Sequence, residues 1–243
     1  MVTGASHGIG LGVARALGES GARVILVGRS AQALERAAEE LRAAKIDALT
    51  SAFDLLNANG IASWFEECVL QFGQPDILVN SAGMTRRGPA TELTLSDWND
   101  VMGLNVTAIF ELSRVFARGL IGSGRKGKIV NIASLMTAAT RPGTSAYTAS
   151  KGAVGQLTKA LAIDWAPHGI HVNAVAPGYV ATELTRALMD DPAFDAWVKK
   201  RCPLGRWGAP EDIAWPVVFL CSPASDFMTG QVIYADGGWL STF

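Results

Sequence analysis

A tyrosine and a lysine, Tyr147 and Lys151, stand four residues apart in a segment whose apolar residues follow helical spacing. On a helix this spacing places both side chains on one face, with their Cβ atoms about 5–6 Å apart. A phenol has an ordinary pKa of about 10, so lowering it to about 7 requires roughly 4 kcal/mol. A lysine ammonium about 4 Å away supplies energy of that order. The pair therefore predicts acid–base chemistry, in which the tyrosine exchanges a proton with an alcohol or carbonyl oxygen.

Two further polar residues are candidates for the same site. Ser134 lies thirteen residues before Tyr147 and follows the apolar run 129–132. Ligands of open α/β sheets bind outside the carboxyl ends of the strands, so its hydroxyl is expected to face the substrate oxygen. A local cap is the simpler explanation of an isolated serine at such a place. Asn105 stands inside a predicted helix, a position that its side chain disfavours.

A glycine-rich turn with Gly4, Gly8 and Gly10 precedes a predicted helix over 11–17. Gly4 allows a tight turn, Gly8 allows the backbone to approach a pyrophosphate, and Gly10 allows helix and sheet to pack closely. The amino end of the helix offers free N–H groups to that anion. Such a turn also occurs where glycines serve packing alone, but its place between strand and helix favours a dinucleotide site.

Short apolar runs rich in β-branched residues alternate with helical segments along the chain. Strands are predicted at 23–27, 76–80, 128–132 and 170–175, and helices at 31–44, 96–118 and 146–166. Runs without strict alternation indicate burial on both faces, as in a parallel sheet covered by helices. The pattern predicts an α/β fold, a doubly wound (Rossmann) parallel sheet with helices on both faces, in a single domain of residues 1–243.

The first strand has only residues 1–3 before Gly4, although this strand is central in such a sheet and pairs on both sides. Unpaired backbone groups in a sheet interior cost about 1–3 kcal/mol each. We therefore expect that the natural chain starts upstream, or that this chain is destabilised.

The charge balance argues against several classes of partner. The 243 residues carry 21 basic and 22 acidic side chains, a formal net charge of -1, which gives no field for gathering nucleic acid or an anionic membrane. No apolar stretch approaches the roughly 18 residues of a membrane span. Cys68, Cys202 and Cys221 are odd in number and far from histidines at ligand spacing, so we expect no metal site and reduced thiols in a cytoplasmic protein.

Five motifs occur together and in order: the turn G-x-x-x-G-x-G at 4–10, Asn-Ser-Ala-Gly at 80–83, Ser134, Tyr147-x-x-x-Lys151, and Pro-Gly at 177–178. In these motifs the sequence resembles the short-chain dehydrogenase/reductase family over essentially its whole length. Serine at position 81 departs from the usual Asn-Asn-Ala-Gly.

The resemblance implies a nicotinamide-dependent oxidoreductase that interconverts an alcohol and a ketone through the catalytic tetrad Asn105, Ser134, Tyr147 and Lys151. In reduction Tyr147 would donate the proton while Ser134 holds the oxygen. Lys151 would lower the tyrosine pKa and bind the nicotinamide ribose, and Asn105 would support a water linked to it. The resemblance also implies a homotetramer, with the helices at 96–118 and 146–166 forming one interface.

The same resemblance implies where the dinucleotide would be held. Asp54 would meet the adenine amine, Asn80 would steady the sheet, and the residues after Pro177 would hold the carboxamide. The predicted cofactor-binding residues are Gly4, Ser6, His7, Gly8, Ile9, Gly10, Arg29, Asp54, Leu55, Asn80, Ala82, Gly83, Tyr147, Lys151, Pro177, Gly178, Val180 and Thr182.

The end of the second predicted strand lacks the acidic residue that accepts the ribose hydroxyls of NAD. Arg29 follows Gly28 instead and offers a guanidinium to a 2′-phosphate. His7 stands where family members with this preference often carry a base. NADP(H) is therefore the expected cofactor and NAD(H) the alternative. A solvated helix start and a loop residue are the simpler explanation of Arg29 and His7.

Several segments, among them 84–87, 141–144, 202–208 and 236–240, resemble gluconate 5-dehydrogenases and related deoxygluconate dehydrogenases. A guanidinium binds a carboxylate through two parallel bonds, so Arg86 and Arg87, together with Ser134 and Tyr147, are the predicted substrate residues for a sugar acid. Surface salt bridges are the alternative for the two arginines. The functions left open are a 3-oxoacyl-[acyl-carrier-protein] reductase or other carbonyl reductase and, more remotely, a non-catalytic dinucleotide-binding protein.

Overall fold

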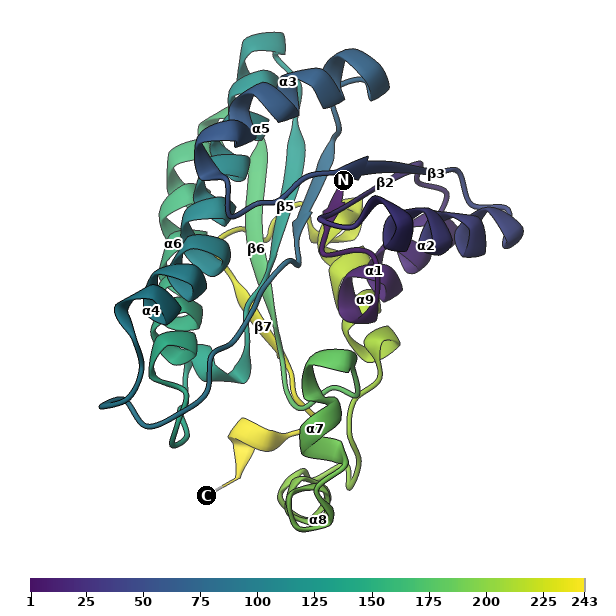
Figure 1. Cartoon of the computed structure of the whole chain (residues 1–243). Coiled ribbons are helices and arrows are strands. Elements are labelled where there is room, and N and C mark those ends of the chain that lie inside the picture. Colours follow the sequence, from purple (N-terminus) through teal and green to yellow (C-terminus); the bar gives the residue numbers. More distant parts are fainter. Residues whose placement is uncertain (243) are drawn as a thin grey trace.

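A parallel sheet lies between two layers of helices in the computed structural model, which describes residues 1–242 (Figure 1). Its seven strands follow the order β3-β2-β1-β4-β5-β6-β7. They are β1 (Val2–Thr3), β2 (Val24–Gly28), β3 (Ala48–Ala52), β4 (Ile77–Asn80), β5 (Gly127–Ile132), β6 (Ile170–Pro177) and β7 (Val232–Ala235). The strand order reverses between β1 and β4, so the sheet is doubly wound and the predicted fold class is confirmed.

Three helices cover each face of the sheet. On one side lie α1 (Gly8–Glu19), α2 (Ala31–Ala43) and α9 (Pro210–Cys221), and on the other lie α3 (Ile61–Phe72), α5 (Ala108–Ser123) and α6 (Ser145–Trp165). Successive strand residues serve opposite layers, as in β2, where Leu26 packs into the first layer and Val27 into the second. Three further helices, α4 (Leu95–Met102), α7 (Arg186–Met189) and α8 (Pro192–Arg201), complete the fold.

The predicted elements differ from the observed ones mainly at the edges of the sheet. The sequence analysis omitted β3 and β7, because both are edge strands whose residues are mostly half-buried and form no continuous apolar run. The single helix predicted over 96–118 is also interrupted. A π-helical turn at Gly103–Thr107 separates α4 from α5.

The short first strand is held on both sides. Val2 pairs with Leu26 of β2 and with Val79 of β4. Beyond it, the Thr3 hydroxyl accepts hydrogen bonds from the backbone N–H groups of Ser81 (2.9 Å) and Ala82 (3.0 Å). These bonds tie the glycine turn after β1 to the loop after β4.

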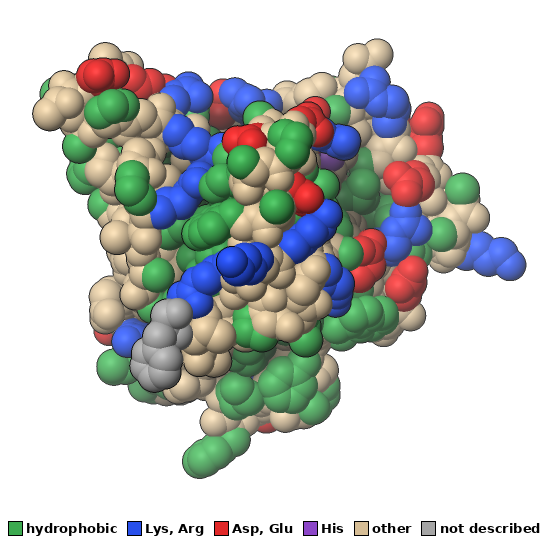
Figure 2. All heavy atoms as spheres, turned by 90° about the horizontal axis from the view of Figure 1, so that it is seen from below, with side chains coloured by type: hydrophobic (Ala, Val, Ile, Leu, Met, Phe, Trp, Pro, Cys, Tyr) green, Lys and Arg blue, Asp and Glu red, His purple; other side chains and the backbone are tan. Residues whose placement is uncertain are grey.

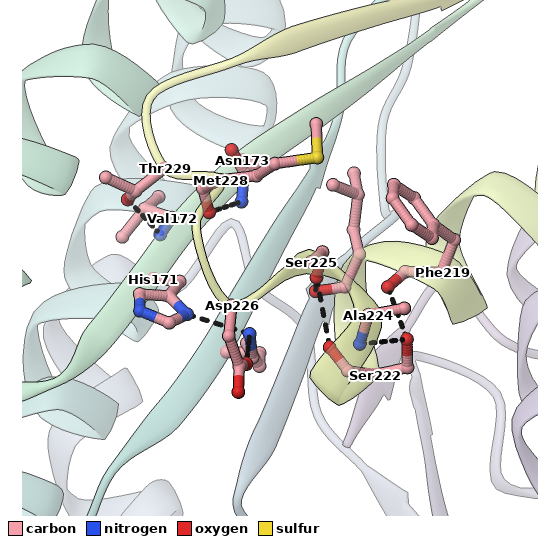
Figure 3. Close-up of polar contacts among 12 residues, drawn as sticks. His171, Val172, Asn173, Phe219, Ser222, Ala224, Ser225, Asp226, Met228 and Thr229 are labelled. Carbon is pink, nitrogen blue, oxygen red and sulfur yellow. Dashed lines mark hydrogen bonds and ion pairs between the residues drawn. The ribbon is translucent and has the colours of Figure 1, made fainter.

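The amino end of the sheet carries a charged cluster of its own. Nζ of Lys128 lies 2.8 Å from Nδ1 of His171 and 2.7 Å from the Asp226 carboxylate, and Figure 3 shows His171 and Asp226 at this place. Nearby, the Asn173 side chain donates to the carbonyl of Met228 (2.9 Å) and accepts from the N–H of Gln231 (3.0 Å), which fixes the connection from α9 to β7 (Figure 3).

Among the helices of residues 1–242, none combines the length and the apolar character that a membrane span requires.

Candidate active site

A cleft of about 730 Å³ opens along the carboxyl ends of the central strands. It collects most of the predicted cofactor and catalytic residues: Gly4, Ser6, His7, Gly8, Ile9, Gly10, Arg29, Asp54, Leu55, Ala82, Gly83, Ser134, Tyr147, Lys151, Pro177, Gly178, Val180 and Thr182. Of the predicted site residues, Asn80, Arg87 and Asn105 do not line it, whereas Arg86 does.

The glycine turn leaves one end of the cleft open to a phosphate. A Cβ on Gly4 (φ +64°) would lie 2.9 Å from Cα of Ala82, and a Cβ on Gly10 would overlap the carbonyl of Gly4. His7 is the N-cap of α1 but places no side chain on the free N–H groups, and no acidic residue stands in the first turn. The bare amino end of α1 therefore fits an anion such as a pyrophosphate.

A second part of the cleft lies between the carboxyl ends of β2 and β3. Arg29 is exposed there and has no ion pair among residues 1–242, and Asp54 accepts the N–H of Leu56 at 3.0 Å. His7 contacts the Ser6 hydroxyl at 2.8 Å and approaches the carboxylate of Glu183 to 3.7 Å. This end of the cleft thus carries the positive charge of Arg29 without an acidic partner in the described part of the chain.

Ser134, Tyr147 and Lys151 meet on the other side of the cleft. Ser134 follows β5, its hydroxyl oxygen accepts the N–H of Met136 at 3.1 Å, and its hydroxyl is also hydrogen-bonded to Tyr147. Tyr147 lies in the first turn of α6, one turn before Lys151. The lysine is buried, and its ammonium donates to the carbonyl of Ile132 at 2.7 Å. The arrangement brings a phenolic hydroxyl, a serine hydroxyl and a lysine ammonium to one side of the cleft.

The electrostatics of Tyr147 differ from the prediction. Burial raises the pKa of Tyr147, while the hydrogen bond to Ser134 and the positive charge of Arg87 act to lower it. Burial also lowers the pKa of Lys151 to about 8. The ammonium lies 5.7 Å from the centre of the tyrosine ring. The expected lowering of the tyrosine pKa to about 7 by Lys151 is therefore absent from this structure, because burial opposes the charged form of both groups.

Asn105 occupies the π-helical turn between α4 and α5, which accounts for an asparagine in a long helical segment. Its buried side chain accepts the N–H of Met84 (2.9 Å) and donates to the carbonyl of Met84 (2.9 Å) and to the hydroxyl of Ser150 (3.0 Å). Ser150 in turn donates to the carbonyl of Tyr147 at 2.7 Å. Asn105 thus joins the loop after β4 to the first turns of α6.

Asn80 lies beneath the cleft rather than in it. Its buried amide donates to Ser113 (3.0 Å) and to Asn131 (2.9 Å), and Asn131 continues to Thr158 (3.0 Å). This chain of hydrogen bonds crosses β4, β5, α5 and α6 at the level of the sheet. Its place fits the expected support of the sheet, but no amide hydrogen of Asn80 faces the cleft.

The two adjacent arginines have different surroundings. Arg86 forms ion pairs with Asp97 (3.2 Å) and Asp100 (3.6 Å), so its charge is already compensated. Arg87 lies near Arg141 instead. Burial and, next, the positive charge of Arg141 lower the pKa of Arg87, while the charges of Tyr179 and Tyr147 act to raise it. Arg86 thus fits the alternative of a surface salt bridge, whereas Arg87 has no acidic partner in the part of the chain that the structure describes.

Sequence reasoning missed an aromatic cluster beside Tyr147. Tyr179, directly after Gly178, contacts the rings of Trp239 (4.8 Å between centres), Trp207 (5.6 Å) and Phe194 (5.7 Å). These residues come from three separate segments, so no local spacing signals them. Leu104, Met84 and Leu184, which also line the cleft, were missed for the same reason.

Comparison with known proteins decides the family. Residues 4–240 match the family described as "Enoyl-(Acyl carrier protein) reductase". The chain is 45% identical to gluconate 5-dehydrogenase of Gluconobacter oxydans, over 98% of this chain and 93% of that protein. The crystal structure of a gluconate 5-dehydrogenase from Burkholderia cenocepacia in complex with NADP and tartrate is 40% identical with a TM-score of 0.95, covering 99% of this chain and 94% of that one.

The chain belongs to the short-chain dehydrogenase/reductase family. It is an oxidoreductase that acts on CH–OH groups, and the predicted family is confirmed. A third similar protein in this family is galactitol 2-dehydrogenase (L-tagatose-forming) of Cereibacter sphaeroides, 45% identical over 98% of this chain and 93% of that protein. Short-chain dehydrogenase/reductases of equal similarity to this chain are thus named for a sugar acid and for a neutral polyol.

Proposed function

We propose that this enzyme is an NADP(H)-dependent oxidoreductase that interconverts a secondary alcohol and a ketone on a sugar acid such as gluconate and 5-ketogluconate. The observation that carries the proposal is the meeting of Ser134, Tyr147 and Lys151 at one side of a cleft whose other side has the bare amino end of α1 and Arg29. The names of the similar gluconate dehydrogenases support the sugar-acid substrate.

The residues present fit a dinucleotide. The glycine turn and the free N–H groups of α1 would hold its pyrophosphate, and Lys151 would bind the nicotinamide ribose. Arg29 would bind a 2′-phosphate through a charge-assisted hydrogen bond, which favours NADP(H) over NAD(H). When bound, the nicotinamide supplies or accepts a hydride at the substrate carbon.

The protein's own residues would manage the proton. In reduction, the Tyr147 hydroxyl donates its proton to the substrate oxygen, and in oxidation the phenolate takes the proton back. The Ser134 hydroxyl, whose lone pair is engaged by Met136, donates to the same oxygen and stabilises its developing negative charge. The raised pKa of Tyr147 keeps it protonated at neutral pH, which suits an acid in the reducing direction. Asn105 positions the first turns of α6 through Ser150.

A polyol dehydrogenase is the second candidate, because galactitol 2-dehydrogenase is as similar to this chain as gluconate 5-dehydrogenase is. A 3-oxoacyl-[acyl-carrier-protein] reductase is the third candidate, since the description of the matching family also names a reductase of substrates held on an acyl carrier protein. Activity should be measured with NADPH and NADH on 5-ketogluconate, L-tagatose and a 3-oxoacyl thioester, and with NADP and NAD on gluconate and galactitol. A kcat/KM for a neutral polyol or a thioester above that for the sugar acids contradicts the proposed substrate.

We also propose a cytoplasmic homotetramer built from one continuous domain. Exposed apolar side chains support the proposed tetramer. Trp215 and Phe219 of α9, together with Phe227, are exposed beside the edge strand β7, and Ile163 is exposed on α6. Large exposed side chains grouped in this way are typical of interfaces between subunits. The free thiols of Cys68, Cys202 and Cys221 suit a reducing compartment. Sedimentation equilibrium tests the tetramer, and a monomer at micromolar concentration contradicts it.

A further inference from the structure

Two arginines from different loops are brought together near Tyr147. The N–H of Gly88 donates to the carbonyl of Gly143 at 3.2 Å, which joins the loop after β4 to the loop before α6. Both glycines have positive φ, +155° and +74°, so the crossing depends on backbone that other residues rarely adopt. Arg87 precedes Gly88 and Arg141 lies two residues before Gly143, so the crossing brings the two guanidinium groups near each other.

Neither arginine has an acidic partner among residues 1–242, although Arg86, next to Arg87 in the chain, contacts two aspartates. Arg141 instead places its guanidinium 5.1 Å from the centre of the Phe194 ring. Burial and, next, the positive charge of Arg141 lower the pKa of Arg87. Two like charges without a counter-ion repel each other, and an anion between them removes the repulsion. Figure 2 views this end of the molecule and shows Lys and Arg side chains bordering a hollow lined by apolar side chains.

Two tyrosines lie within reach of the charges of this arginine pair. The charge of Arg87 acts on both Tyr147 and Tyr179, and Arg141 acts on Tyr179 as well. The Tyr179 ring is held by Trp239, Trp207 and Phe194, but its hydroxyl has no hydrogen-bond partner in the part of the chain that the structure describes. The Tyr179 hydroxyl and the two guanidinium groups can all donate hydrogen bonds. Together they offer several donors to an acceptor that carries negative charge.

We propose that Arg87 and Arg141 bind the carboxylate of the substrate and that the Tyr179 hydroxyl donates a third hydrogen bond to it. The site rests on the proposed function, since its ligand is the acid group of the molecule whose alcohol reacts at Tyr147. In this proposal the two arginines that bind the carboxylate come from different loops, and Arg86 is not one of them. The site also gives the enzyme a means of selecting a sugar acid over a neutral polyol of the same length, because only the acid offers an anion to the guanidinium groups.

The test compares an acid with its neutral counterpart. The kcat/KM for oxidation is measured on gluconate and on glucitol with the wild-type enzyme, Arg87→Met, Arg141→Met and Tyr179→Phe. A charge-assisted hydrogen bond contributes about 1.5–3 kcal/mol, so each arginine variant is expected to lose roughly 10- to 150-fold on gluconate. Tyr179→Phe loses a hydrogen bond to the same charged carboxylate and is therefore expected to lose roughly 10- to 150-fold as well. On glucitol all three variants are expected to stay within about threefold of the wild type.

The control is Arg125→Met, which removes an arginine paired with Asp76 at the amino end of the sheet, far from the cleft. It should leave both substrates unchanged. Removing one of two repelling charges should also leave Arg87→Met and Arg141→Met as stable as the wild type, which a thermal melt checks. An equal loss on gluconate and glucitol, or no loss on gluconate, overturns the carboxylate site.

A binding measurement separates this inference from the proposed function. Tartrate, a dicarboxylate, is titrated into the enzyme with NADP while the melting temperature is followed, so that binding is measured without a turnover assay. The wild type should be stabilised and the two arginine variants should not. If the wild type prefers neutral polyols yet tartrate stabilises it through Arg87 and Arg141, the proposed substrate fails and the anion site stands. Equal stabilisation of wild type and variants overturns the site whatever the substrate.

Discussion

Asn105 holds the backbone of Met84 from both sides, accepting its N–H and donating to its carbonyl at 2.9 Å each. The same side chain reaches Ser150, whose hydroxyl donates to the carbonyl of Tyr147. One buried amide therefore sets the distance between the loop after β4 and the helix that carries the proposed acid. That distance matters because a displacement of about 1 Å at a reacting group can cost about 100-fold in rate.

Asn105→Ala should lower both stability and activity. It leaves the N–H and carbonyl of Met84 without partners, at a cost of about 2–4 kcal/mol in the free energy of unfolding. It should also lower kcat by at least about tenfold at saturating cofactor. Urea unfolding and steady-state kinetics measure the two effects.

The matched control is Asn173→Ala. Asn173 makes a similar double contact with the backbone of Met228 and Gln231, but it holds the connection from α9 to β7 and has no contact with the helix that carries Tyr147. It should lose similar stability and keep its kcat. Similar losses of kcat in both variants would show that Asn105 acts only through stability.

Tyr147→Phe should remove nearly all turnover while cofactor binding is kept, because only the ionisable hydroxyl is lost. General acid–base groups contribute about 100- to 10,000-fold, so we expect a loss in that range. Lys151→Met should weaken cofactor binding as well, since this residue is expected to bind the ribose. Turnover and the fluorescence of bound NADPH are the two measurements. A Tyr147→Phe enzyme with more than about a tenth of normal activity contradicts the assignment.

Arg29→Ala should change the choice of cofactor. Arg29 stands at the end of β2 without an ion pair in the described chain, and no acidic residue takes its place. A charge-assisted bond of about 1.5–3 kcal/mol corresponds to a preference for NADP over NAD of roughly 10- to 150-fold. The ratio of kcat/KM values for the two cofactors, at one ionic strength, should fall by that factor in the variant. A wild-type preference for NAD, or an unchanged ratio, would show that another group reads the phosphate.

The stability of the protein should fall as the pH drops below about 6.5 through His171. Burial and, next, the charge of Lys128 lower its pKa from 6.5, Lys126 acts in the same direction, and Asp226 opposes them. The unfolded chain then binds more protons than the folded one between the folded pKa and 6.5, so stability rises with pH across this window. His171→Gln should flatten that part of the profile, measured by urea unfolding between about pH 5 and 7.

His168→Gln is the control, because His168 is exposed in the turn before β6. It should leave the slope of the profile unchanged. The His171 interpretation is wrong if both variants keep the wild-type slope. Asp226 adds a second loss at lower pH, since the hydrogen bond from Lys128 lowers its pKa below 3.8 and its contribution disappears as the carboxylate is protonated.

The sequence by itself determined the sheet, the layers and most of the cleft. Residues 4–10, Ser134 and the pair Tyr147 and Lys151 follow local rules, such as a glycine turn before a helix and two residues one helical turn apart. Local geometry fixes such patterns wherever they fold, so the cleft contains them as predicted. The edge strands were missed because half-buried residues give a weak periodic signal.

Tertiary structure alone decided which charges meet. Arg86 and Arg87 look equivalent in the chain, yet one contacts Asp97 and Asp100 on α4, and the other is brought toward Arg141 by the crossing of two loops at Gly88 and Gly143. The pKa values of Tyr147 and Lys151 likewise depend on burial, which no spacing encodes. Electrostatic interactions depend on distances between atoms and on the depth of burial, and for residues far apart in the chain only the folded structure sets these.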